Sequence, residues 1–183
     1  MRLTEQELPI SKVPSGIAGF DTLSRGGLPK GRATLVAGSP GSAKTIFATQ
    51  FLVAGIQANE PAVFVTFEES PEDIRRNMLP LGWDIASWED EGRWLFVDCR
   101  EQASDQGVIG TYSLEPLTLR IRHAIKRIVG QRLVVDSLAA LLQRFPDQIT
   151  IRGEIQRVLN SLKELSMTAI ITAERVDEYG PIS

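Results

Sequence analysis

A run of small residues that ends in Lys-Thr could bind phosphate through its main chain. It comprises Gly38, Ser39, Pro40, Gly41, Ser42, Ala43, Lys44 and Thr45. Small side chains let consecutive backbone N–H groups turn toward one anion, and a following helix adds the positive end of its dipole. The lysine would reach the β- and γ-phosphates of a nucleotide, and the threonine hydroxyl would bind Mg²⁺. The run therefore predicts a nucleotide-binding P-loop, in which we include Ile46 as the last contact residue.

Position 43 departs from the usual pattern, G-x-x-x-x-G-K-[ST], because this chain has alanine where the pattern has glycine. A Cβ atom is harmless there if φ is negative and helical, and obstructive if φ is positive or a phosphate oxygen packs against it. An ordinary turn with a chance Lys-Thr pair is the alternative. The flanking elements favour the P-loop. Residues 33–37 predict a buried strand before it. A helix from the loop to about residue 58 is predicted by apolar residues at helical spacing, namely Ile46, Phe47, Phe51, Leu52 and Ile56.

Three carboxylates follow predicted strands. Asp136 comes at the end of an apolar strand and resembles the Walker B acid that holds Mg²⁺ directly or through water. Glu68 and Glu69 follow another strand, where lost solvation and mutual repulsion should raise the pKa of one of them. One of the two, preferably Glu69, would activate the water that attacks the γ-phosphate. The alternatives are a common turn acid at Asp136 and an exposed acidic start to the next helix at the glutamate pair.

The elements that must position these residues alternate along the chain. Strands are predicted over residues 33–37, 61–67, 94–98, 133–137 and 167–172, with helical segments between them that include 46–58, 82–92, 114–129 and 151–165. Helices that regularly separate strands indicate an α/β fold with a mainly parallel central sheet flanked by helices. Such sheets bind ligands at the carboxyl ends of their strands, where the P-loop and the three carboxylates fall.

Domain boundaries follow from composition. Residues 1–13 are polar and contain proline, so we expect an extended N-terminal arm, and residues 14–183 are expected to form one α/β domain. A strand ends shortly before Ser183 without a helix to cover it, so we expect the domain to continue further.

The bulk properties limit partners and location. The chain has a net charge of −3, one cysteine, no signal-like N-terminus and no apolar run near the ~20 residues of a membrane span. We therefore expect a cytoplasmic protein without a disulfide framework, not bound to a membrane and not expected to bind nucleic acid. The basic residues of segment 114–129 are interpreted as a solvated face, although they could contact nucleic acid or a neighbouring subunit. They are Arg120, Arg122, Lys126 and Arg127.

With these residues assembled, the chain resembles the KaiC family, the RecA-like ATPases of the cyanobacterial circadian clock and their bacterial relatives. The resemblance runs from about residue 13 to the end and is closest to the first of two tandem domains. Three segments carry it, namely Gly19-Phe20-Asp21 with 26–31, the block 63–71 with Gly82-Trp83-Asp84, and Thr172-Ala173-Glu174-Arg175 with 178–182.

The resemblance implies a RecA-like P-loop NTPase fold and homohexameric rings with ATP bound between neighbouring subunits. It also implies slow hydrolysis, with Glu69 matching the catalytic glutamate and Glu68 beside it. Phosphate contacts would fall on Ser42, Lys44 and Thr45, and Thr45 would also bind Mg²⁺. The polar loop at 100–113 lies where the family docks KaiB, so a KaiB-like protein is an implied partner.

Two other functions remain open on this reasoning. A DNA-dependent ATPase similar to RecA or RadA would use the basic helix, but the acidic balance and the lack of interleaved aromatic residues disfavour it. A non-hydrolysing assembly module would use ATP only to hold subunits together, and Ala43 in the P-loop is compatible with that reading.

Overall fold

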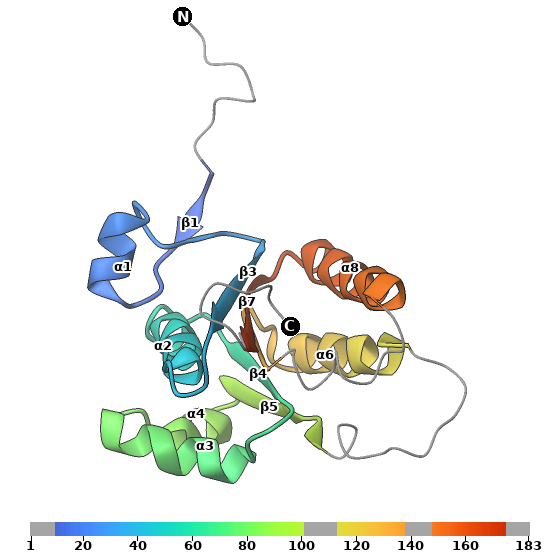
Figure 1. Ribbon diagram of the computed structural model, residues 1–183. Helices are drawn as coiled ribbons and strands as arrows, with labels where there is room; N and C mark the ends of the chain where they lie inside the picture. The colour runs from blue at the N-terminus through green and yellow to red at the C-terminus, as the bar shows by residue number, and fades with distance from the viewer. Residues whose placement is uncertain (1–9, 101–112, 138–147, 175–183) are drawn as a thin grey trace, which may run out of the picture.

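The computed structural model describes residues 10–100, 113–137 and 148–174 (Figure 1). Within them, one sheet has the strand order β3-β7-β6-β4-β5 and every neighbouring pair is parallel. Its strands are β3 (Ala33–Gly38), β4 (Ala62–Thr66), β5 (Trp94–Asp98), β6 (Arg132–Asp136) and β7 (Thr168–Glu174). The predicted α/β fold with a parallel sheet is confirmed. Because β7 lies between β3 and β6, the P-loop and Asp136 follow strands that are separated by one strand.

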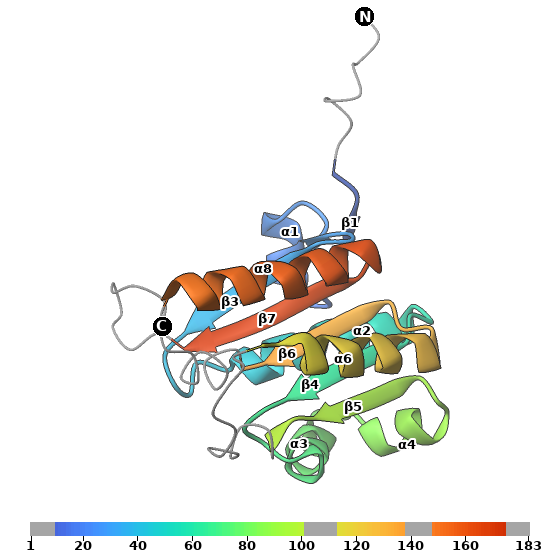
Figure 2. The same ribbon diagram turned by 90° about the vertical axis from the view of Figure 1, so that its right-hand side faces the viewer.

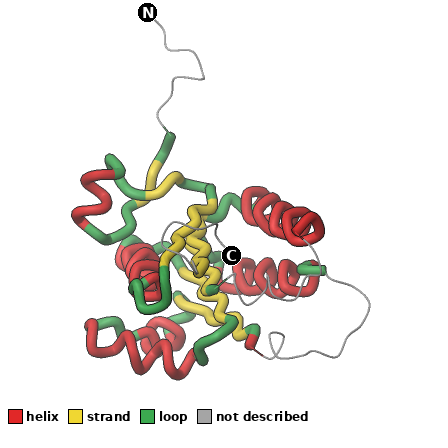
Figure 3. The backbone as a smooth tube through the Cα atoms, viewed as in Figure 1, coloured by secondary structure: helices red, strands yellow, loops and turns green. Residues whose placement is uncertain are grey.

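Helices cover both faces of this sheet. Figure 1 shows α2, α3 and α4 on one face and α6 and α8 on the other, and Figure 2 shows α6 and α8 running along the strands. The tube in Figure 3 shows the same division into a central sheet and flanking helices. The helices are α1 (Ala18–Leu23), α2 (Lys44–Gln57), α3 (Pro71–Met78), the 3₁₀ turn η2 (Leu79–Leu81), α4 (Ile85–Asp90), α6 (Glu115–Ile128) and α8 (Gln148–Glu164). In this described part of the chain, no helix combines the length and apolarity needed to cross a membrane.

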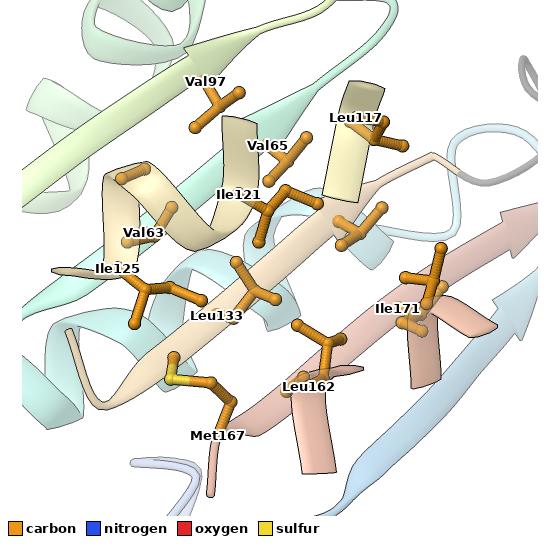
Figure 4. Close-up of a cluster of buried hydrophobic side chains, with 14 of the residues drawn as sticks. Val63, Val65, Val97, Leu117, Ile121, Ile125, Leu133, Leu162, Met167 and Ile171 are labelled. Carbon is orange, nitrogen blue, oxygen red and sulfur yellow. The ribbon is translucent and has the colours of Figure 1, made fainter. Parts of the chain in front are cut away.

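Alternation along the strands builds one hydrophobic core on each side of the sheet. On β4, Val63 and Val65 face the α6 and α8 side, where Figure 4 shows them near Ile121 and Leu133. Phe64, between these two valines, belongs to the other cluster, with side chains from α2, α3 and α4. Because successive strand residues point to opposite faces, burial on both faces produces the nearly continuous apolar sequence of β4.

Several local expectations can be checked against these elements. The side chain of Ser70 accepts a hydrogen bond from the Asp73 N–H group and caps the N-terminus of α3. Ile46 is 44% exposed, so its assignment to the buried face of α2 is wrong. The helix α2 begins at Lys44, so Ile46 is its third residue and lies next to the P-loop. Residues 1–9, most of the 100–113 loop and residues 175–183 lie outside the described part.

The end of the expected N-terminal arm is extended and packed. Lys12–Val13 form β1, which pairs antiparallel with β2 (Leu28–Pro29). Val13 is buried and belongs to the core cluster under α2. Asp21 in α1 secures the next residues, since its carboxylate accepts hydrogen bonds from the main chain of Ser15 and Gly16.

A buried arginine at the start of β6 connects three separate parts of the chain. The Arg132 side chain is only 2% exposed and forms an ion pair with Glu60 at 2.6 Å. It also donates hydrogen bonds to the main-chain carbonyls of Pro14 and Phe51. A Cβ atom at Gly55 would lie 2.4 Å from the Arg132 Cδ atom, so glycine in α2 makes room for this side chain. A buried charge with this many partners holds the N-terminal segment and α2 against the sheet.

We predict that Arg132→Met lowers the free energy of unfolding by about 3 kcal/mol, because Glu60 and two carbonyl groups lose their charged donor. Urea denaturation measures this change. Arg127→Met, at an exposed position of α6, is the matched control and should change stability by less than about 0.5 kcal/mol. Equal effects of the two substitutions would contradict the role given to Arg132.

Candidate nucleotide-binding site

The P-loop, residues 38–45, turns between the last residue of β3 and the first turn of α2. A Cβ atom at Gly38 would lie 2.4 Å from the Ser42 Oγ atom, so a larger residue there would force the Ser42 side chain to turn away. Gly41 has a φ of +75°, a conformation that glycine adopts without strain. The first N–H groups of α2 have no partner within the helix and point toward this loop end, as an anion site requires.

Ala43 occupies the left-handed region of backbone conformation. Its φ is 62° and its ψ is 26°, and it is the N-cap residue of α2. This is the positive-φ case in which a Cβ atom is unfavourable, and such a conformation costs roughly 1–2 kcal/mol for a residue with a Cβ. The loop therefore keeps the backbone conformation that the usual glycine favours, at the expense of local strain.

Lys44 and Thr45 lie where the sequence predicts the phosphate and metal contacts. The Lys44 ammonium group donates to the carbonyls of Gly38 and Ser39 at 3.0 and 2.9 Å, so it lies against the loop. The Thr45 hydroxyl donates to Asp136 Oδ2 at 2.7 Å. Two residues that are 91 positions apart in the chain thus meet at the edge of the sheet.

The Asp136 carboxylate has a hydrogen-bond partner on each oxygen. Thr45 from α2 donates to Oδ2, and the hydroxyl of Thr172 from β7 donates to Oδ1. Two donors on opposite oxygens restrict rotation of the carboxylate.

The glutamate pair lies on the loop after β4, next to Asp136. The N–H group of Phe67 donates to the main-chain carbonyl of Asp136, which joins the two strand ends. Glu68 accepts a hydrogen bond from the Ser137 hydroxyl at 2.6 Å. The Thr66 hydroxyl donates to the main-chain carbonyl of Glu69 at 2.5 Å, and the Asn77 amide lies 3.5 Å from the Glu69 carboxylate. The two adjacent carboxylates therefore have different surroundings.

The pKa of Glu69 is raised above the ordinary glutamate value. Loss of solvation is the main cause, and the negative charge of Asp136 is the second. The charge of Glu68 contributes least among the causes, so the expected mutual repulsion of the pair is a minor part of the shift. A carboxyl group with a raised pKa is better suited to accept a proton near neutral pH.

The donor set fits a nucleotide-bound Mg²⁺ ion. Within residues 10–100, 113–137 and 148–174, no three His, Cys, Asp or Glu side chains cluster as a metal site. The site offers instead one hydroxyl and one carboxylate, from Thr45 and Asp136. Mg²⁺ prefers oxygen ligands and keeps several waters, so one or two protein ligands plus phosphate oxygens are the usual arrangement.

Buried hydroxyl residues surround the predicted acids. Thr66, Ser137 and Thr172 are all buried, and their hydroxyls donate to the main chain of Glu69 and to the carboxylates of Glu68 and Asp136 respectively. Ser137 stands out in the sequence as a polar residue beside Asp136, whereas sequence reasoning missed Thr66 and Thr172. A signal was present for these two, because each is a hydroxyl residue near the carboxyl end of a strand with an apolar centre. Because the sequence does not show which strands are neighbours, the hydrogen-bond partners of these residues could not be predicted.

The basic residues of α6 lie on the opposite face of the sheet from α2 (Figure 1). Arg120, Lys126 and Arg127 are exposed, and Arg120 donates to the main-chain carbonyl of Asp98. The sequence interpretation of a solvated face agrees with this exposure. The three tryptophans pack in the core or at its rim, with Trp94 1% exposed and Trp83 and Trp88 partly buried against the core.

A P-loop after β3, an acid after β6 with one strand between them, and an acidic pair after β4 define a RecA-like P-loop NTPase. A family model described as "ATPase: KaiC" matches residues 13–183. The chain belongs to the KaiC ATPase family.

Individual relatives agree with this assignment. The chain is 53% identical over 175 residues to the circadian clock protein KaiC3 of Synechocystis sp., which covers 95% of this chain and 35% of that protein. It is 46% identical over 182 residues to the circadian clock oscillator protein KaiC of Thermosynechococcus vestitus, covering 98% of this chain and 35% of that protein. For KaiC of Synechococcus elongatus the identity is 42% over 175 residues, covering 95% and 34%. The chain thus spans about a third of the length of these curated relatives.

We predict that Ala43→Gly increases the free energy of unfolding by roughly 0.5–1 kcal/mol. Relief of the left-handed strain exceeds the entropy that glycine adds to the unfolded chain. Urea denaturation checks the change. Ala58→Gly at the other end of α2 is the matched control, and it should not stabilise because Ala58 has a φ of −90°. A less stable Ala43→Gly variant would disprove strain at this position.

The raised pKa of Glu69 predicts a pH-dependent effect of Glu69→Gln on stability. In the range between the unfolded and folded pKa values, the folded protein binds the proton more tightly than the unfolded chain does. Ionised Glu69 therefore destabilises the folded state above its folded pKa, and this effect disappears below the ordinary value of 4.5, where both states are protonated. Glu69→Gln should be more stable than the unmodified chain at pH 7–8 and should lose this advantage toward pH 4.

Urea denaturation across this pH range makes the test. Glu68→Gln is the control, and it is not expected to gain stability because the Glu68 carboxylate accepts the hydrogen bond from Ser137. A constant difference between Glu69→Gln and the unmodified chain at all pH values would contradict the prediction.

Proposed function

We propose that this chain binds Mg-ATP at the P-loop and hydrolyses it slowly within a ring of identical subunits that acts in circadian timing or related signalling. The hydrogen bond between the Thr45 hydroxyl and the Asp136 carboxylate carries the proposal. It joins the helix after the P-loop to the end of β6, which is the pair of groups that would hold a metal beside bound phosphates.

Binding is assigned to the P-loop main chain and to Lys44. Residues 38–43 would cradle the phosphates with their N–H groups, and Ile46 would complete the contact surface at the start of α2. The Lys44 ammonium group would exchange its two loop carbonyls for phosphate oxygens, so its present position against the loop supports the role. Mg²⁺, held by Thr45 and Asp136, would neutralise charge on the phosphates.

Glu69 is the better candidate for activating the attacking water. Its pKa is raised, its main-chain carbonyl is held by Thr66, and its carboxylate accepts a long hydrogen bond from Asn77 at 3.5 Å that a bound water could replace. Glu68 accepts the hydrogen bond from Ser137 and would assist by shaping the loop.

Assembly and partners rest on the family. KaiC and KaiC3 relatives of matching sequence are circadian clock proteins, which supports a timing or signalling role. Self-association into a hexamer with ATP at subunit interfaces is what the family resemblance implies. A KaiB-like protein would dock at the 100–113 loop. In a ring, a neighbouring subunit would cover one side of the site, so turnover should depend on oligomer formation.

Steady-state ATP hydrolysis and ATP binding, measured together, test the proposal. We predict that Lys44→Ala weakens ATP binding at least tenfold, whereas Glu69→Gln keeps binding and loses hydrolysis at least a hundredfold. Lys126→Ala, an exposed lysine of α6, is the control for Lys44 and should behave as the unmodified chain does. Glu68→Gln should retain more hydrolysis than Glu69→Gln.

The outcomes separate this function from the two alternatives. Unchanged ATP affinity in Lys44→Ala would refute binding at the P-loop. Binding and oligomer formation without any hydrolysis, even in the unmodified chain, would favour the assembly module. Hydrolysis that single-stranded DNA stimulates strongly would favour the DNA-dependent ATPase.

A further inference from the structure

Thr172 lies at the carboxyl end of the strand that separates the P-loop strand from the Asp136 strand. It pairs in register with Val36 of β3, and the preceding residue, Ile171, pairs with Val135 of β6. Thr172 therefore stands beside Asp136 at the sheet edge. It is fully buried, in a strand whose other central residues are apolar or small.

The Thr172 hydroxyl has a single proton and two acceptors within reach. The Val135 carbonyl lies 3.4 Å away, whereas the hydroxyl approaches Asp136 Oδ1 more closely. The proton therefore goes to the carboxylate, because the shorter, charge-assisted hydrogen bond is the stronger one.

Asp136 thus accepts hydrogen bonds from two threonines, and only one of them has a second proposed role. Thr45, which donates to Oδ2, is partly exposed at the end of the P-loop and has the proposed second task of binding the metal. Thr172 is buried and belongs to the rigid centre of the sheet. When Thr45 turns to the metal, Thr172 is the support that can keep the Asp136 carboxylate in place.

We propose that Thr172 is a positioning residue, which fixes the Asp136 carboxylate in the orientation that Mg-ATP binding and hydrolysis need. This inference rests on the proposed function. It assigns the buried hydroxyl of β7 to the metal-dependent part of binding, and it gives Thr172 no contact with the phosphates themselves.

Thr172→Val removes the hydroxyl at almost constant volume. ATP binding is measured by isothermal titration calorimetry, in excess EDTA and at a series of Mg²⁺ concentrations. The variant should bind ATP in EDTA as the unmodified chain does, while the gain in affinity that Mg²⁺ provides falls about tenfold, as expected for loss of a hydrogen bond to a charged group. The hydrolysis rate at saturating ATP should fall by at least the same factor, and Thr172→Ser should restore both.

Thr168→Val is the matched control on the same strand. Thr168 is also buried, but its hydroxyl accepts a hydrogen bond from the Gly31 N–H group at the opposite end of β7. This variant should keep the Mg²⁺ dependence of the unmodified chain. Thr172→Ala, which cannot introduce a clash, gives a second measurement should Thr172→Val fold poorly, and it should show the same loss.

Two results would overturn the inference. One is normal Mg²⁺ dependence in Thr172→Val or Thr172→Ala, and the other is an equal loss in Thr168→Val, which would mean general damage to β7. Failure of the proposed function would look different, because the unmodified chain would then bind no ATP at any Mg²⁺ concentration.

Discussion

The candidate site depends on the register of three parallel strands, β3, β7 and β6. Val134 and Val135 are buried on opposite faces of the sheet, and this alternation fixes the direction in which Asp136 points. A shift of one residue would turn Asp136 to the other face, because side chains alternate along a strand. Two apolar cores therefore fix the position of a polar site that neither of them contains.

Buried hydroxyl groups separate the site from those cores. Thr66, Ser137 and Thr172 each direct a hydrogen bond to one of the acidic residues or to its main chain. Away from the sheet edge, the buried hydroxyls of Thr49 and Ser161 have no such partner among the described residues. An unmade hydrogen bond in the interior is costly, so the well-paired hydroxyls at the edge indicate where orientation of side chains matters most.

Much of the fold could be predicted from the sequence because its signals are local. Apolar runs such as the one in β4 and the Ser70 cap of α3 do not depend on distant residues. The partners of Asp136 could not be predicted, because they depend on strand order, and the strand between β3 and β6 is the last one along the described part of the chain. The backbone of Ala43 was also undecided, since the sequence allowed either sign of φ. The site residues themselves were named from the motif, and their roles stay predictions.

The different surroundings of Glu68 and Glu69 follow from the same strand order. Because β4 and β6 are neighbours, the loop after β4 passes beside Asp136 and Ser137. The Ser137 hydroxyl donates to the Glu68 carboxylate, and the Thr66 hydroxyl donates to the main-chain carbonyl of Glu69. The Glu69 carboxylate then loses part of its solvation and lies close to the charge of Asp136, and both effects raise its pKa. The two adjacent glutamates thus have different surroundings, which is the reason for giving Glu69 the proposed role of general base.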